Sequence, residues 1–320
     1  MSAIDTTTAR PTYPQMWPSY NAAQIWEKQN VAQMLSELCE SIHAPVQKRG
    51  RPRIPLGDAI FCAVMKVYGT TSGRRAMSDL HTYAEQRLID RAPHYNTIFA
   101  ILEDATITPI LKALVETSAR AMRHVERDFA VDSTGFSTRT YMRWFDTKYG
   151  KMRCESGWVK AHIMVGVKTK IITSIEVTPS NVGDTSCYRP LLESTAKRFT
   201  LVEVSADKAY STRRNLRLTR WLGADPLIPF KSNSRPSNDP LWARLRKRFT
   251  EEPDEFYRRY HKRSNVETAF SMMKRKFGAF VRSKSAVAQV NELLCKALCH
   301  NLCVILEASY ESPHGDNGVA

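Results

Sequence analysis

The spacing of apolar residues divides the chain into a helical first part and a mixed second part. From Val31 to Leu38, apolar side chains recur every three to four residues, which is typical of an amphipathic helix. The same period predicts helices over residues 58–68, 76–87, 96–103 and 109–125. Residues 1–20 are rich in Thr, Pro, Ser and Tyr without a sustained period, and we expect a mobile arm there. An all-helical region is therefore predicted over residues 21–125.

The pattern changes at Phe129, where short β-branched runs begin. Strands are predicted over residues 129–131, 159–167, 171–177, 201–205 and 227–230, the last at a sheet edge because it contains Pro229. Helices are predicted over residues 189–198, with Pro190 in the first turn, over 213–222, capped by Ser211 or Thr212, and over most of the chain from there to Tyr310. This order predicts an α/β domain over residues 126–310, a mixed sheet flanked by helices, followed by a disordered tail over 311–320.

Charge adds a partner to this picture. The 320 residues include 47 Lys and Arg against 32 Asp and Glu, a net charge of +15, which favours a polyanion as partner. Residues 208–284 hold 20 of the basic and 7 of the acidic residues, a balance of 20 − 7 = +13, and we interpret them as a phosphate-binding surface, with a solvated face as the alternative. No run of roughly 18 apolar residues is free of charges, so no membrane contact is expected. Seven cysteines without paired spacing favour a reducing compartment.

Two aspartates follow predicted strands. Asp132 comes after residues 129–131, and Asp207 comes after residues 201–205. The carboxyl ends of strands form the rim where open sheets bind ligands, although each residue alone also suits a turn or a helix cap.

A third acidic residue, Glu267, lies in a predicted helix from Tyr260 to Lys274. At about 100° per residue, an arc of roughly 60° holds Tyr260, Arg263, Glu267 and Lys274. A neighbouring arc is apolar and holds Val266, Phe270, Met273 and Phe277. An ordinary amphipathic helix with internal ion pairs explains the same pattern. Three carboxylates, however, can also hold two Mg²⁺ ions ~3.5–4 Å apart for displacement at phosphorus, with Arg263 and Lys274 positioning the phosphate.

These residues together resemble the DDE transposases of bacterial insertion sequences, of the broad IS-four and IS-five type. The family's helix signature, Y-x2-R-x3-E-x6-K, is matched by Tyr260, Arg263, Glu267 and Lys274, and Asp132 and Asp207 stand where the family carries its first and second catalytic aspartates. The resemblance covers residues 128–306 and implies an RNase H-like fold. It implies that Asp132, Asp207 and Glu267 are catalytic and bind metal, Mg²⁺ or Mn²⁺, with two ions expected. It also implies that Tyr260, Arg263 and Lys274 contact DNA.

The resemblance further implies a function. The chain is expected to be a metal-dependent DNA endonuclease and strand transferase that cuts the inverted-repeat ends of its element and transfers the freed 3′-hydroxyl into target DNA. Its partner is then double-stranded DNA, on which it assembles as a homodimer, in the bacterial cytoplasm in association with the nucleoid. Two alternatives remain, a catalytically inactive DNA-binding protein derived from a transposase and a host nuclease with the same core.

Secondary signals concern DNA binding outside this domain. Arg49 and Arg51, in the basic stretch 48–53, resemble the core of an AT-hook that inserts arginines into a narrow minor groove, and a plain basic linker is the alternative. Residues 58–103 suit either a helix-turn-helix or a structural bundle.

For several further residues, a structural role competes with a functional one. Cys295, Cys299 and Cys303, with His300 beside them, fit small core residues better than a metal site. His162 is expected to be structural, with an active-site role as the alternative, and Asp184 to be a turn or cap residue rather than a metal ligand. Some relatives stabilise a flipped base with a tryptophan; Trp221 and Trp242 lie in that interval, and we expect both to be packing residues.

Overall fold

The computed structural model describes residues 16–42, 53–138 and 157–311. Before the sheet, the described helices are α1 (Trp17–Ile25), α2 (Glu27–Cys39), α3 (Leu56–Tyr68), α4 (Gly73–Glu85), α5 (Tyr95–Glu103), α6 (Ile107–Ala119) and the 3₁₀ turn η1 (Arg120–Met122). The helices expected from periodicity are confirmed to within a few residues, except that α6 ends earlier than residue 125. The arm expected over residues 1–20 is wrong for residues 17–20, which are helical, and residues 1–15 lie outside the described part.

Five strands form one mixed sheet in the order β3-β2-β1-β4-β5. The strands are β1 (Asp128–Ser137), β2 (Trp158–Gly166), β3 (Ile172–Pro179), β4 (Glu203–Ala206) and β5 (Asp225–Leu227). β2 pairs antiparallel with β1 and β3, whereas β4 pairs parallel with β1 and β5. The sheet with its flanking helices confirms the RNase H-like α/β fold expected from the sequence.

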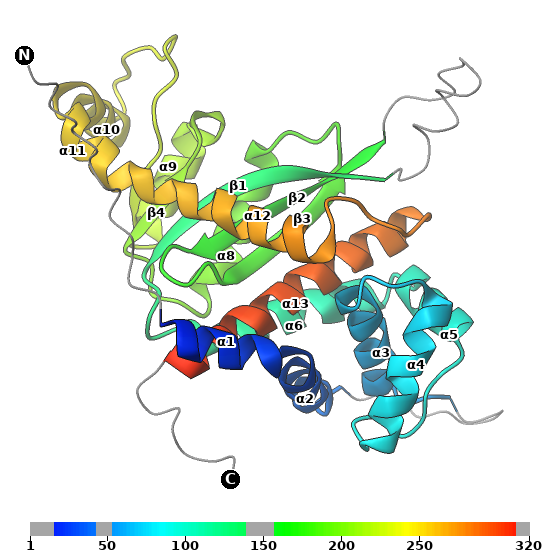
Figure 1. Cartoon of the computed structure of the whole chain (residues 1–320). Coiled ribbons are helices and arrows are strands. Elements are labelled where there is room, and N and C mark those ends of the chain that lie inside the picture. The colour runs from blue at the N-terminus through cyan, green and yellow to red at the C-terminus, as the bar shows by residue number, and fades with distance from the viewer. Residues whose placement is uncertain (1–15, 43–52, 139–156, 312–320) are drawn as a thin grey trace, which may run out of the picture.

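Helices cover both faces of the sheet. They are α8 (Thr185–Ala196), α9 (Arg213–Trp221), α10 (Pro240–Glu251), α11 (Pro253–Tyr260), α12 (Ser264–Phe277) and α13 (Ala286–Glu311), with the 3₁₀ turns η2 (Lys208–Tyr210) and η3 (His261–Arg263). One buried cluster joins the helices from α2 to α6 with α12, α13 and one sheet face, and a second joins α8, α9 and α10 to the other face. Figure 1 shows α12 crossing β1 and the N-terminal helices gathered around α13.

Two predicted boundaries were wrong for tertiary reasons. α8 begins at Thr185, so Pro190 is inside the helix rather than in its first turn, because burial of Cys187 and Tyr188 extends the helix toward its start. The fifth strand is Asp225–Leu227 rather than 227–230, because it pairs with β4 in that register. Its place at the sheet edge is confirmed.

The helix α13 is the longest described helix of the protein and is rich in apolar residues. Among the described residues it is the helix that is long and apolar enough to cross a membrane, but 72% of its most apolar 18-residue window is buried inside the protein. It packs against α1, α2, α3, α5, α6, β3 and α12, as the core helix of a folded domain does.

Candidate active site

Asp132 and Asp207 are neighbours on adjacent strands. β1 and β4 run parallel, with Val131 opposite Ala206. Asp132 directly follows Val131, and Asp207 directly follows Ala206. Since neighbouring strands lie about 5 Å apart, the two aspartates meet at the point where β4 ends. The prediction that Asp132 ends its strand was wrong, because β1 continues to Ser137 through its pairing with β2. The prediction that Asp207 directly follows a strand is confirmed.

Glu267 reaches the same place from α12. The single helix expected from Tyr260 to Lys274 is interrupted, because α11 ends at Tyr260 and the 3₁₀ turn η3 precedes α12. The predicted apolar stripe is confirmed and packs α12 against the sheet; its members are all buried, and they are Val266, Phe270, Met273 and Phe277. Packing of this stripe leaves Glu267 exposed in the first turn of α12, beside β1.

Arg263 links two of the three carboxylates. One guanidinium nitrogen donates to Asp132 Oδ2 at 2.8 Å, and the other donates to Glu267 Oε1 at 2.6 Å. Burial raises the pKa of the Asp132 carboxyl, and the charges of Asp207 and Glu267 raise it further, while the Ser133 amide and Arg263 lower it. The three carboxylates therefore act on one another electrostatically, with one described cation, Arg263, in direct contact with them.

The other two signature residues flank this group. Burial raises the pKa of Tyr260 to about 12, an effect that Asp207 and Asp132 increase, and the Arg263 guanidinium lies 5.8 Å from the centre of the Tyr260 ring. The Lys274 ammonium donates to Thr134 Oγ1 at 2.6 Å. Thr134 is two residues after Asp132 and so lies on the same face of β1. The structure thus brings Tyr260 and Arg263 to the carboxylates and Lys274 one step further along β1.

The donor set fits a hard divalent cation. Carboxylate oxygens are the ligands that Mg²⁺ and Mn²⁺ prefer, and the three acidic groups at this edge outnumber the cation that contacts them. In the described part of the chain, no three His, Cys, Asp or Glu side chains are already arranged around one common point. The Arg263 guanidinium bridges the Asp132 and Glu267 carboxylates.

Sequence reasoning gave little weight to a polar group on the opposite face of β1. His162 is fully buried, faces Ser133 across β1 and β2, and hydrogen-bonds Thr178 Oγ1 through Nε2 at 2.8 Å. Asp184 precedes α8 and pairs with Lys160 at 2.9 Å. Asp184 occupies the N-cap position of α8, but its side chain makes no cap hydrogen bond; its carboxylate also lies 3.7 Å from His162 Nδ1. Successive side chains of a strand point to opposite faces, so this alternation along β1 could have placed Ser133 on the face opposite Asp132.

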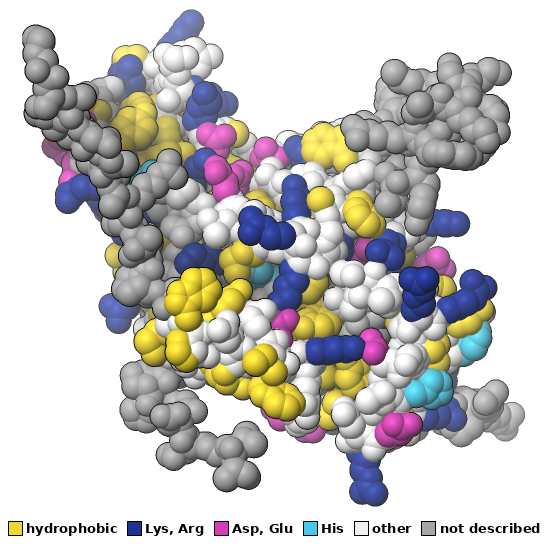
Figure 2. Space-filling view, viewed as in Figure 1, with side chains coloured by type: hydrophobic (Ala, Val, Ile, Leu, Met, Phe, Trp, Pro, Cys, Tyr) yellow, Lys and Arg dark blue, Asp and Glu magenta, His cyan; other side chains and the backbone are white. Residues whose placement is uncertain are grey.

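The predicted basic surface is partly occupied by internal ion pairs. Arg259 and Lys262 bind Glu203, and Arg259 and Arg248 bind Asp225. These acidic residues begin β4 and β5, at the sheet edge opposite the catalytic candidates. Figure 2 shows other Lys and Arg side chains in the middle of the face where α12 crosses the sheet. The +13 excess therefore serves both the fold and the surface around α12.

The remaining candidates divide between the core and the surface. Cys295, Cys299 and Cys303 are buried, and burial raises the pKa of Cys303 to about 12, as expected for core thiols. Trp242 is a packing residue, with its ring 4.8 Å from that of Phe230.

For Trp221 the packing prediction was wrong, because its side chain at the end of α9 is 78% exposed. Arg49 and Arg51 lie outside the described residues. α3, α4 and α5 contact one another, an arrangement compatible with either reading of residues 58–103.

Comparison with known proteins agrees with this geometry. The model of the family described as "Transposase DDE domain" matches residues 123–302, more than half of the 320-residue chain and a range that includes all three carboxylates. A stretch of 102 residues is 35% identical to a protein described as "Probable transposase for insertion sequence element ISA1214" from Archaeoglobus fulgidus. That stretch covers 32% of this chain and 31% of the relative, so the match spans about a third of the relative's length.

Proposed function

The chain belongs to the transposase DDE domain family, and we propose that it cuts DNA at the inverted-repeat ends of an insertion sequence and transfers the freed 3′-hydroxyl into target DNA. The observation that carries this proposal is the convergence of Asp132 and Asp207, side by side on parallel strands, with Glu267 on the helix that crosses them. All three acidic residues beside a basic surface suit phosphodiester chemistry, whereas a purely DNA-binding protein would gain only repulsion from them.

The proposed metal ligands are Asp132, Asp207 and Glu267, and the proposed metal is Mg²⁺ or Mn²⁺, with two ions. When bound, such ions supply Lewis-acid stabilisation of the attacking and leaving oxygens during an in-line displacement. The chain itself provides the alignment. β1 and β4 fix the two aspartates relative to each other, and the buried stripe of α12 fixes Glu267 relative to both.

Arg263, Lys274 and Tyr260 are proposed to bind the DNA backbone. Arg263 is free to exchange a carboxylate partner for a phosphate oxygen, because its guanidinium presents several donors in one plane. Lys274 has no carboxylate partner among the described residues, so its ammonium is available to a phosphate next to Thr134. Joining two ends in one reaction requires two such sites, and a homodimer assembled on DNA supplies them.

The test is cleavage of a duplex that carries the inverted repeat, by the full-length chain with Mg²⁺ or Mn²⁺. We expect Asp132→Asn, Asp207→Asn and Glu267→Gln each to lower the cleavage rate by about 10³-fold or more, because each removes an anionic ligand for the metal ions proposed to stabilise the transition state. Asp254→Asn is the matched control, since Asp254 is exposed at the start of α11 and outside the site, and it should cut at the parental rate.

Each other outcome has a definite meaning. Cleavage by all three variants at the parental rate would overturn the active-site assignment. Binding of the ends by the parent without cleavage would favour an inactive DNA-binding protein, and cleavage without joining to target DNA would favour a nuclease.

A further inference from the structure

The connection between α12 and α13, residues 278–285, is held to the end of β1 by its backbone. We call it the α12–α13 arch. Ser137 donates its amide to the Ala279 carbonyl at 3.2 Å, and Val281 donates its amide to the Ser137 carbonyl at 2.8 Å. This short parallel bridge, between Ser137 and Phe280, extends the sheet by one connection beyond its five strands. The arch therefore has a fixed position relative to β1, the strand that carries Asp132.

Two buried charged residues of α13 form hydrogen bonds with the backbone of the same arch. Glu292 accepts hydrogen bonds from the amides of Arg282, at 3.0 Å, and Ser283, at 2.8 Å. Lys296, one turn later, donates to the carbonyls of Gly278 and Phe280. Both side chains are about 2% exposed. Together they pair with backbone carbonyls in the first part of the arch and with backbone amides in the part that follows.

Burying these charges is expensive, and stability alone does not account for them. The desolvation cost is several kcal/mol per ion, and an apolar pair of similar volume is often as stable as a buried ion pair. What an apolar pair cannot do is bind four backbone groups of an irregular segment in fixed places. The position of Glu292 and Lys296 is therefore explained by the geometry of the arch that they hold.

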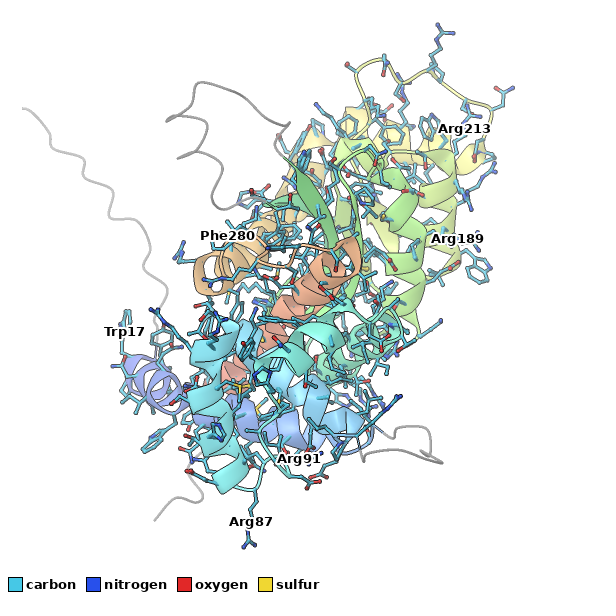
Figure 3. All side chains as sticks on the ribbon, turned by 90° about the vertical axis from the view of Figure 1, so that its right-hand side faces the viewer. Trp17, Arg87, Arg91, Arg189, Arg213 and Phe280 are labelled. Atoms are coloured by element: carbon cyan, nitrogen blue, oxygen red, sulfur yellow. The ribbon has the colours of Figure 1, made fainter. Side chains whose placement is uncertain are left out.

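The arch presents cations outward. The side chains of Arg282 and Lys284 are exposed, and neither forms an ion pair with a described acidic residue. The Arg282 guanidinium lies 5.6 Å from the centre of the Phe280 ring, which supports it from one side. Figure 3 shows Phe280 on the connection between α12 and α13.

These cations continue a line that begins at the active site. Along β1, Arg263 contacts Asp132, Lys274 contacts Thr134, and the arch contacts Ser137. Ser137 is five positions after Asp132 along β1, a distance of about 16 Å at ~3.3 Å per residue. Each strand of duplex DNA carries one phosphate per ~3.4 Å of its axis, so a duplex along this line presents several phosphates to these cations.

We propose that the α12–α13 arch is a binding surface for the phosphate backbone of duplex DNA that flanks the cleavage point, with Arg282 and Lys284 as the contacts. Glu292 and Lys296 are positioning residues that hold the arch in place. This inference rests on the proposed function, because it assumes that the scissile phosphate lies at Asp132. It extends the binding surface beyond Tyr260, Arg263 and Lys274.

The test measures binding of a random-sequence 30-base-pair duplex to the full-length chain, in EDTA, at a series of salt concentrations. In the double variant Arg282→Ala/Lys284→Ala, the slope of log Kobs against log salt concentration should become shallower by about 2, one for each lost phosphate contact. The control is Arg189→Ala/Lys197→Ala, which removes the same charge from two exposed positions, one on α8 and one directly after it. Figure 3 shows Arg189 on the side of the molecule away from Phe280. The control should keep the parental slope.

An unchanged slope in Arg282→Ala/Lys284→Ala, or an equal loss in the control, would overturn the proposal. Glu292→Gln tests the positioning role while both cations stay present, and it should raise amide exchange at Arg282 and Ser283 and weaken binding. Parental exchange and binding in that variant would remove Glu292 from the proposal. Arg282→Ala/Lys284→Ala tests DNA binding by the arch even where Glu292→Gln fails to fold. If the parent cuts DNA and the double variant binds like the parent, the arch proposal fails alone; if the parent neither binds nor cuts, the proposed function fails.

Discussion

Two groups of polar and charged residues connect the sheet region to the neighbouring helices α12 and α13, and they differ in their exposure to solvent. The site cluster, Asp132, Asp207, Arg263 and Glu267, is formed by β1, β4 and the start of α12, and its side chains remain partly open to solvent. The α13 cluster, Glu292, Lys296, His300 and Asn301, is at most 2% exposed. Both clusters join a helix to the sheet, but they differ in what completes them.

The α13 cluster is completed by the chain's own backbone. Asn301 accepts from the Ile172 amide and donates to the Ile172 carbonyl, both at 2.8 Å, and His300 contacts the Lys170 carbonyl at 2.9 Å. The site cluster has an excess of acidic groups that the described residues do not neutralise. A buried charge needs all its partners within the fold, whereas a charge kept for chemistry needs a partner from outside.

The largest expected effect in this comparison is the loss of stability in Lys296→Met. The substitution keeps the length of the side chain but leaves two carbonyls without a donor and Glu292 without its neighbouring cation. Breaking a buried pair costs about 3–5 kcal/mol of unfolding free energy, measured by chemical denaturation. Lys197→Met, at an exposed position, should change it by less than about 0.5 kcal/mol. A similar loss in both variants would mean that the α13 cluster is not a special point of the fold.

Sequence reasoning found the elements because their signals are local. The helical period located α3 and α12, and the β-branched runs located β2 and β3. It missed the second half of β1, because residues 132–137 contain Asp, Ser, Thr and Gly and are held as a strand by pairing with β2. Pairing partners so far apart along the chain leave no local pattern.

The candidate site was predictable to a similar depth. Residue types and spacing indicated all three carboxylates, but they could not show that Arg263 bridges Asp132 and Glu267, since Asp132 is 131 residues away along the chain. The α13 cluster was invisible for the same reason. Its polar residues look out of place on an apolar helix until the backbone groups that they bind are known.

The second effect in size is acid sensitivity from His300. Burial lowers the pKa of His300 to about 4, and Lys276 lowers it further, while the contact with the Lys170 carbonyl opposes the shift. The unfolded chain, with an ordinary pKa near 6.5, therefore takes up a proton first as the pH falls. Stability is present above about pH 6.5 and is lost between pH 6.5 and 4, by about 3 kcal/mol at the lower limit.

Denaturation at pH 7, 6, 5 and 4 measures this loss. In His300→Gln, the glutamine amide can still donate to the Lys170 carbonyl, but it does not take up a proton. The unfolding free energy of this variant should therefore fall less than that of the parent between pH 7 and pH 4. Equal pH dependence in the two proteins would assign the acid loss to other groups, and the α13 cluster would lose its role as an acid-sensitive part of the fold.

A third, smaller effect concerns the excess negative charge of the site cluster. If the acidic excess binds Mg²⁺ or Mn²⁺ in the folded state only, a concentration of ten times Kd should stabilise the chain by about 1.4 kcal/mol, because folding and binding are linked. The measurement is thermal unfolding in EDTA and in rising Mn²⁺. Asp132→Asn should lose most of this gain, and Lys296→Met should keep it. Equal stabilisation of Asp132→Asn and the parent would place the bound ion elsewhere.

The smallest expected effect is that of Glu267→Gln on stability. The Glu267 side chain is 59% exposed, and its contact with Arg263 is an ion pair four residues apart on the surface of the helix. Such pairs contribute about 0.3–0.5 kcal/mol, so the unfolding free energy without divalent ions should change by no more than that. The same substitution is expected to stop cleavage. A loss of several kcal/mol would instead show that Glu267 holds the fold together, as Glu292 and Lys296 do. The two clusters would then differ in exposure but not in purpose, because a carboxylate that stabilises the protein needs no cation from outside to explain its position.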